Sequence, residues 1–165
     1  MKLSVRHVFP CTVDEFWALF WDPEYDLRLQ SGTAVARELL EDRDGADAHV
    51  QRWRFVPEQR LPAMIAKMAG TDRLTYDQDT RWDKQTRVLT WRVVPALMSD
   101  KVTAAGTLVV RAVPEGVERL VEGNIDVRVT FIGGQIEQAI VRSVEQGYEA
   151  AAAATFAMLR ERTKT

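Results

Sequence analysis

The last part of the chain, residues 133–160, repeats apolar and polar side chains with the period of an α-helix. When the residues are placed at steps of 100°, apolar and small side chains gather on one broad face and charged ones lie opposite. Such a helix would be roughly 39 Å long at about 1.5 Å per residue, so a large part of the protein must cover its apolar face. This face takes Ile136, Ala139, Ile140, Ser143, Val144, Gly147, Tyr148, Ala150, Ala151, Ala154 and Met158, and the polar face takes Gln138, Arg142, Glu145 and Glu149.

Between residues 33 and 131 the apolar side chains recur with period two, which is typical of β-strands. The connections at 42–45, 82–85 and 114–116 contain Asp, Gly or Pro residues that favour tight turns. Short turns between successive strands predict an antiparallel meander. The pattern predicts six strands here, over residues 34–42, 46–56, 72–82, 87–95, 101–113 and 116–131.

The start of the chain predicts one more strand, over residues 3–9, followed by two short helices. Pro10 ends the strand, and Thr12 with Glu15 forms a capping-box pattern that favours a helix start. The Asp-Pro pair at residues 22–23 then opens a second helix over 23–30, because proline suits the first helical turn.

Two connections, residues 57–70 and 95–100, carry apolar side chains where a polar turn would be sufficient. In the first, Met64, Ile65 and Met68 can share one face of a short helix. Three interpretations remain open for this segment: a core-covering loop, a helix that plugs one end of the sheet, or a lid. As a lid, residues 61–69 would also make transient contact with a membrane, because flexible apolar side chains suit that role.

The element order resembles the helix-grip fold of the START-like (SRPBCC) superfamily, which includes lipid-transfer domains, polyketide aromatase/cyclases and the pollen-allergen group. The most specific local match is residues 7–25, HVFPCTVDEFWALFWDPEY, which looks like the usual opening of this superfamily. Residues 101–107 and the segment from Gly133 onward are similar to an uncharacterised bacterial branch. The resemblance covers the whole chain, but its motif is structural and carries no catalytic residue.

This resemblance implies an α+β fold in one domain over residues 1–165. A curved antiparallel sheet of about seven strands would wrap around the long C-terminal helix, with two short helices after the first strand. A hydrophobic cavity would lie between the sheet and the helix. Because members of the superfamily differ in chemistry, the fold does not decide the function.

Composition and charge narrow the class of protein. The 165 residues are 46% hydrophobic and 28% charged, which is ordinary for a globular domain. The net charge of −2 without a basic block gives no sign of nucleic-acid binding. Cys11 is the single cysteine, the N-terminus is unlike a signal peptide, and no stretch of about 18 apolar residues could span a bilayer. We therefore expect a cytoplasmic protein with a buried or half-buried Cys11 thiol.

The sequence contains no recognisable catalytic or metal-binding motif. His7, His49 and Cys11 lack the spacing of metal ligands, and no P-loop, G-x-S-x-G or G-x-G-x-x-G pattern is present. We expect neither a metal nor a cofactor, and His7 is best interpreted as a hydrogen-bonded structural histidine. The polar strand residues that could project into a cavity and orient a ligand are Arg54, Tyr76, Arg92, Asn124 and Arg128. The arginines among them are more consistent with the outer face of the sheet, because their stems can lie over apolar surface while the charged ends stay in water.

The small residues on the predicted helix face have two possible explanations. Gly147 inside a helix costs about 1 kcal/mol relative to alanine, so a steric reason is expected. Either the helix packs closely on bulky sheet residues, or the small run from Gly147 to Ala154 leaves room for a ligand. For the second case we predict a ligand site made of Trp53, Phe55, Met64, Met68, Tyr76, Trp91, Ile140, Val144, Gly147, Tyr148 and Ala151.

The hypothesis that these features favour is a carrier or sensor that encloses a hydrophobic small molecule, most plausibly a lipid. The first alternative is an aromatase/cyclase-like or hydratase enzyme that uses a cavity Tyr, His or Arg as acid or base. The second alternative is a protein-interaction module without a cavity. A measured void would separate the first two from the third.

Overall fold

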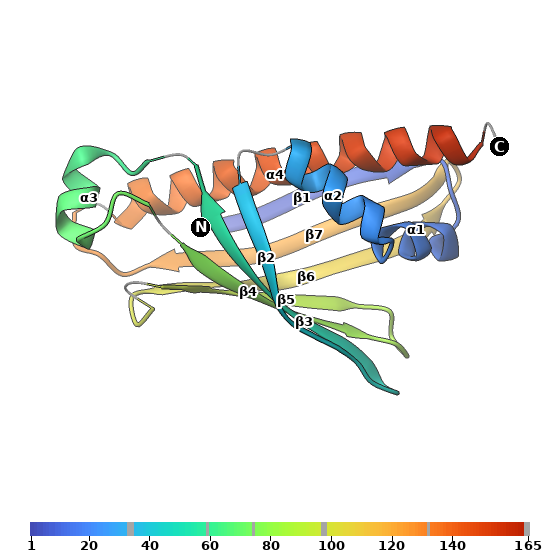
Figure 1. The fold of residues 1–165 in the computed structure, drawn as a ribbon, viewed down its shortest axis with the longest axis horizontal. Helices are drawn as coiled ribbons and strands as arrows, with labels where there is room; N and C mark the ends of the chain where they lie inside the picture. Colours follow the sequence, from blue (N-terminus) through green and yellow to red (C-terminus); the bar gives the residue numbers. More distant parts are fainter. Residues whose placement is uncertain (33–34, 59, 74, 97–98, 132, 164–165) are drawn as a thin grey trace.

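The structure is a computed structural model that describes residues 1–32, 35–58, 60–73, 75–96, 99–131 and 133–163 (Figure 1). A curved sheet lies along one long helix, and shorter helices lie near the two ends of the molecule and beside the long helix. The elements in chain order are β1 (Lys2–Phe9), α1 (Val13–Phe20), α2 (Pro23–Gly32), β2 (Val35–Asp44), β3 (Ala48–Pro57), α3 (Ala63–Ala69), β4 (Tyr76–Asp83), β5 (Leu89–Pro95), β6 (Val102–Val113), β7 (Gly116–Val127) and α4 (Gly133–Arg162).

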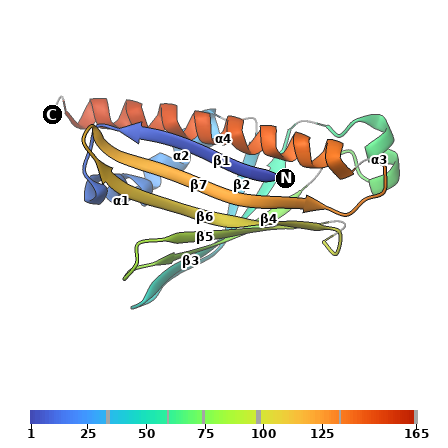
Figure 2. The same ribbon diagram turned by 180° about the vertical axis from the view of Figure 1, so that it is seen from behind.

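The seven strands form one antiparallel sheet in the order β1-β7-β6-β5-β4-β3-β2. α4 makes its extensive contacts with β7, β1 and α2. Strands β3, β4 and β5 curve away from α4, as both views show (Figures 1 and 2). The predicted helix-grip fold is therefore confirmed, with the long helix over one side of the sheet.

The capping box predicted at the start of α1 is present. The Glu15 backbone N–H donates to the Thr12 hydroxyl oxygen at 3.2 Å, and the Thr12 N–H donates to the Glu15 carboxylate at 2.7 Å. This helix fills one end of the sheet with aromatic side chains. The Trp17 ring lies 5.6 Å from Phe16 and 5.1 Å from Trp82 of β4.

The last strand ends at Val127, four residues earlier than the alternating pattern predicts. The Val127 N–H donates to the Glu137 carboxylate at 2.8 Å, and the Gly133 N–H donates to the Val129 carbonyl oxygen at 2.9 Å. Phe131 has a positive φ of 69°, which lies outside the β region, so the predicted strand cannot extend to residue 131. These contacts turn the chain from the sheet into α4.

The Trp91 indole of β5 lies on the helix-covered face of the sheet, against two glycines. A Cβ added to Gly123 of β7 would lie 2.4 Å from the Trp91 ring, and one added to Gly106 of β6 would lie 2.6 Å from it. Only residues without a side chain leave this space. The indole therefore covers two neighbouring strands in the centre of the sheet.

The buried face of α4 differs from the predicted one. Val141, Ala152 and Thr155 are buried, whereas Ala139, Ser143 and Gly147 are exposed. The helix is rotated because it packs on the strands at one edge of the sheet rather than over the centre. A Cβ on Gly147 would have no atom within 4 Å, so close packing does not explain this glycine.

The contact between Trp91 and Gly123 predicts a strong effect of one methyl group. Gly123→Ala should lower the free energy of unfolding by about 1–3 kcal/mol, because the new Cβ overlaps the indole and the Ala105 carbonyl oxygen at 2.8 Å. Urea unfolding followed by tryptophan fluorescence measures this change. An unchanged midpoint would contradict the packing described here.

The same substitution at Gly147 should have the opposite sign. Gly147→Ala should raise the free energy of unfolding by about 0.5–1 kcal/mol, because alanine restricts the unfolded chain and meets no atom in the folded helix. The same urea titration provides the measurement. A loss of stability would show that Gly147 is in close contact after all.

Candidate functional site

Strand register decides which side chains face the helices. Trp53, Tyr76 and Trp91 occupy the helix-covered face of β3, β4 and β5, whereas Arg54 and Arg92 project from the outer face. On the outer face, Arg54 donates to Asp77 at 2.8 Å and Arg92 donates to Asp79 at 3.2 Å. The expectation of an outward position is confirmed for both arginines and, from its exposure, for Arg128. Asn124 is exposed as well, whereas the register pairs Tyr76 with Phe55 under the helices, on the side where a ligand site is predicted.

Arg37 of β2 is the first of two arginines on the helix-covered face. Its guanidinium lies over the Trp53 ring, 4.4 Å from the centroid, and it pairs with the Asp26 carboxylate of α2. Burial lowers the pKa of Arg37 and raises the pKa of Asp26, although each attracts the other. The side chain of Arg37 is 13% exposed, so this ion pair is mostly shielded from water.

Arg119 of β7 is the second arginine and is only 1% exposed. Its Nη2 donates to His7 Nδ1 at 2.9 Å and to the Tyr148 carbonyl oxygen at 3.1 Å. Its guanidinium carbon lies 5.2 Å from the centroids of both the Phe9 and the Tyr148 rings, within the range of cation–π attraction. Burial lowers the pKa of Arg119, and hydrogen bonding to Tyr25 opposes this effect.

His7 connects this arginine to the surface. Its Nδ1 accepts from Arg119, so a neutral ring carries its hydrogen on Nε2, which lies 3.0 Å from the Glu149 carboxylate. Burial, followed by the charge of Arg119, lowers the pKa of His7, and Glu149 acts in the opposite direction. His7 is thus hydrogen-bonded as the sequence predicts, and Glu149 is 72% exposed at the end of the chain of contacts.

Three tyrosine side chains, those of Tyr25, Tyr76 and Tyr148, lie near these two arginines. The Thr155 hydroxyl donates to the Tyr25 hydroxyl oxygen at 3.4 Å, and the Tyr76 ring stacks on Phe55 at 5.0 Å. Burial raises the pKa of Tyr76 and of Tyr148 to about 12, so both phenols are neutral at pH 7. We define the interior polar cluster by its six members: Tyr25, Asp26, Arg37, Tyr76, Arg119 and Tyr148.

The predicted ligand-site residues divide into three groups. Trp53, Trp91 and Ala151 are buried, and Phe55, Tyr76, Ile140, Val144 and Tyr148 are half-buried, all on elements that face the interior. Gly147 is exposed at the side of α4, and Met64 is 68% exposed on α3. The side chains of Ile65 and Met68 lie outside the described part of the structure.

The α3 end of the molecule has an apolar surface. Met64 and Phe131, the latter 99% exposed, belong to α3 and to the β7–α4 connection, which lie side by side in both views (Figures 1 and 2). Exposure of Met64 does not fit a helix that buries this side chain as a plug. A role as a lid or membrane contact for residues 61–69 stays a prediction.

Sequence reasoning missed both interior arginines. The available signal was strand parity: Val117, Arg119 and Val121 share one face of β7, and both valines are fully buried. Val35, Arg37 and Leu39 alternate in the same way on β2. An arginine between two apolar neighbours of the same parity is therefore a candidate for the interior.

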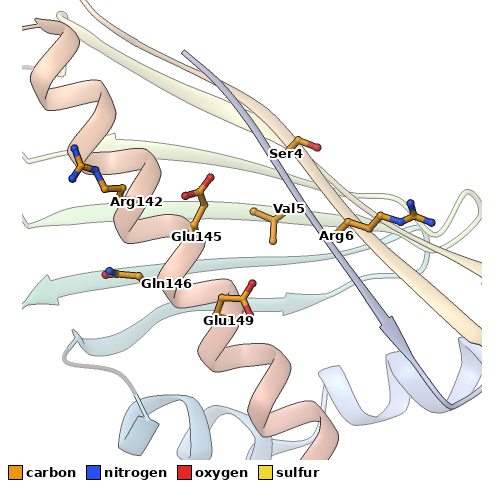
Figure 3. A pocket seen from close by; sticks show the side chains of 7 residues that line it. All are labelled: Ser4, Val5, Arg6, Arg142, Glu145, Gln146 and Glu149. Atoms are coloured by element: carbon orange, nitrogen blue, oxygen red, sulfur yellow. The ribbon is translucent and has the colours of Figure 1, made fainter.

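Two of the hollows formed by the described residues lie on the surface, and no member of the interior polar cluster lines either of them. The larger one, of about 520 Å³, lies between β1 and α4, where Ser4, Arg6, Arg142, Glu145 and Glu149 surround it (Figure 3). The smaller one, of about 310 Å³, lies on the outer face of the sheet and includes Arg52, Asp79 and Arg92. Their mixed charges are those of solvated surface, so we place the candidate site in the interior instead.

Within the described residues, no three His, Cys, Asp or Glu side chains converge as metal ligands. Cys11 is half-buried, as expected, and burial raises the pKa of its thiol. The described helices also include none with the length and apolar character needed to cross a membrane.

Comparisons with known proteins agree with this fold. The model of a family described as "Protein of unknown function (DUF2505)" matches residues 4–159. No curated protein matches the sequence. Solved structures with similar folds include the following three. A Thermus thermophilus protein has a TM-score of 0.63 at 16% identity, with 93% of each chain covered. The Zhui aromatase/cyclase of a Streptomyces species has 0.64 at 14%, covering 99% of this chain and 96% of that one. A Rhizobium leguminosarum protein has 0.60 at 13%, with 93% of each covered.

The position of His7 predicts a dependence of stability on pH. Because the pKa of His7 is lower in the folded protein than the ordinary value of 6.5, the unfolded chain binds the proton more tightly. The His7 contribution should be complete above pH 6.5 and should be lost as the pH falls below it. The free energy of unfolding of the wild type and of His7→Gln, measured from about pH 8 to about pH 5, should show a smaller loss for the variant.

The matched control is the other histidine, His49, whose ring centroid lies 4.3 Å from that of Trp21 and whose Nε2 contacts Asp42 instead of an arginine or Glu149. His49→Gln should keep the part of the slope that His7 contributes. Equal slopes in the wild type and in His7→Gln would contradict the assignment.

Proposed function

This chain belongs to the family described as "Protein of unknown function (DUF2505)" and has a helix-grip fold, and from this basis we propose that it binds a hydrophobic small molecule. The ligand would lie between α4 and strands β3, β4 and β5. A lipid is the ligand that we favour, so the protein would act as a lipid carrier or sensor. Apolar burial would supply most of the binding free energy, at about 25 cal/mol per Å².

One observation carries this proposal. Tyr76 and Tyr148 are surrounded closely enough that burial raises the pKa of each to about 12, yet both keep part of their surface accessible. A side chain that is deep in the protein and still accessible is expected to border an internal space. Phe55, Val93 and Val144 are half-buried in the same way on the neighbouring elements.

The arrangement of the elements supports an opening beside this space. α4 packs on β1 and β7, and β3–β5 curve away from it, so their apolar side chains are not all covered by the helix. The aromatic stack of Phe55 and Tyr76 would then form one wall. Trp53 and Trp91, both buried against the sheet, would form its floor. These residues suit a flat or elongated apolar ligand.

A second candidate function is catalysis in the same space. The observation that favours it is the pairing of neutral phenols with arginines: the Tyr148 ring centroid lies 5.2 Å from the Arg119 guanidinium carbon, and Tyr76 is influenced by the charge of Arg37. A neutral tyrosine can donate a proton to a carbonyl oxygen while an arginine stabilises developing negative charge. The fold shared with an aromatase/cyclase raises this possibility, and turnover of a poly-β-keto substrate would support it.

The proposal is tested by extracting the purified protein with organic solvent and by titrating it with a lipid panel. A blocking variant, Val144→Trp, should weaken lipid binding at least about tenfold, because the indole would fill the space beside Tyr148. Ala153→Trp makes a matched change on an exposed position of the same helix and should leave affinity within about twofold.

Circular dichroism and thermal unfolding establish that each variant folds. Val93→Trp on β5 blocks the space from the opposite wall if Val144→Trp is unstable. Absence of any extracted or bound lipid in the wild type would contradict the proposal. It would favour an interaction module that uses the exposed apolar surface at Met64.

A further inference from the structure

The interior polar cluster carries an unbalanced positive charge. It contains two guanidinium groups, Arg37 and Arg119, and one carboxylate, Asp26. The tyrosines cannot balance the second cation, because the raised pKa values of Tyr76 and Tyr148 keep these phenols neutral. Since Asp26 pairs with Arg37, the unbalanced cation is Arg119.

No carboxylate contacts Arg119 among the described residues. Its partners are a neutral imidazole, a backbone carbonyl, two aromatic faces and the Tyr25 hydroxyl. The charge of Glu149 raises the pKa of Arg119, but this carboxylate contacts His7 rather than Arg119 and is mostly exposed to water, which weakens its effect. A buried cation is costly unless an anion lies close to it.

The Nε–H of Arg119 is also buried and has no hydrogen-bond partner among the residues that the structure describes. The Nε of Arg37 is unpartnered as well, but Arg37 has the Asp26 carboxylate beside it. An unpaired polar group is costly in a site without water. The Arg119 side chain therefore lacks both a countercharge and an acceptor. One anionic oxygen would supply both.

We propose that the ligand is an acidic amphiphile, whose apolar body lies along β3–β5 and whose anionic head pairs with Arg119. This inference rests on the proposed function and names the chemical class of the ligand. The Tyr25 hydroxyl is hydrogen-bonded to Arg119, and the Tyr148 ring centroid lies 5.2 Å from the guanidinium carbon, so these phenols would add hydrogen-bond donors to the head. A carboxylate and a phosphate monoester share this chemistry, and the test distinguishes them.

The test compares three ligands with the same chain: hexadecanoic acid, hexadecyl phosphate and hexadecanol. Displacement of a fluorescent fatty-acid probe from the wild-type protein gives the three dissociation constants. We expect at least one acidic ligand to bind about tenfold or more tightly than the alcohol. Arg119→Met should remove most of this preference and change the affinity for the alcohol less than about threefold.

Arg92→Gln is the matched control, because Arg92 lies on the outer face of the same sheet and is exposed. It should keep the full preference for the acidic ligand. Equal affinities for acid and alcohol in the wild type, or a preference that Arg119→Met leaves intact, would overturn the inference while the proposed function stands. Failure of all three ligands to bind would overturn both.

A second measurement needs no variant, in case Arg119→Met does not fold. Hexadecanoic acid labelled with ¹³C at the carboxyl carbon is bound to the wild type and titrated by NMR. Next to Arg119 the carboxyl group should ionise at a lower pH than in detergent micelles. A carboxyl group that ionises at a higher pH than in micelles would contradict a guanidinium neighbour.

Discussion

The structure depends on how one long helix is covered. α4 has 30 residues, and its apolar side must be removed from water by a sheet whose strands run past it. The helix meets this requirement on β1, β7 and α2, at one side of the sheet. α4 leaves the half of the sheet at β3–β5 uncovered. There, α1 covers one end, and the large aromatic side chains of the strands cover the rest. Trp91 does this in the centre, where Gly106 and Gly123 give it room.

This unequal cover explains the composition of the interior. At the α1 end, Phe9, Phe16 and Trp17 are buried and pack as a conventional core. Towards β3–β5 many side chains are only half-buried, and the charged pair Arg37–Asp26 replaces apolar packing between β2 and α2. The interior is thus closely packed at the α1 end and less closely packed towards β3–β5. A ligand site fits the part at β3–β5, where the fewest side chains cover the sheet.

Most of the fold follows from the sequence, because local signals and global packing agree. The Thr12–Glu15 capping box, the period-two strands and the helical C-terminus each depend on neighbours in sequence. The choice of which face of α4 is buried does not depend on sequence neighbours alone. Ala139, Ser143 and Gly147 are small enough to lie in the core or in water, and tertiary contacts with the edge of the sheet decide their exposure. Arg119 is not among the residues that the sequence analysis singles out, although strand parity assigns it to the face of its buried valine neighbours.

The burial of Arg119 is difficult to explain by stability alone. Replacing a buried ion by an apolar residue of similar volume is often neutral or stabilising, so folding does not require a guanidinium at this position. His7 and the Tyr148 carbonyl hold its Nη2, while Nε is left without an acceptor. Contacts that fix one part of a cation and leave another part unpaired orient it without neutralising it. Such an arrangement is suited to a charge that comes from outside the chain, and it favours a recognition role for this part of the interior over a purely structural one.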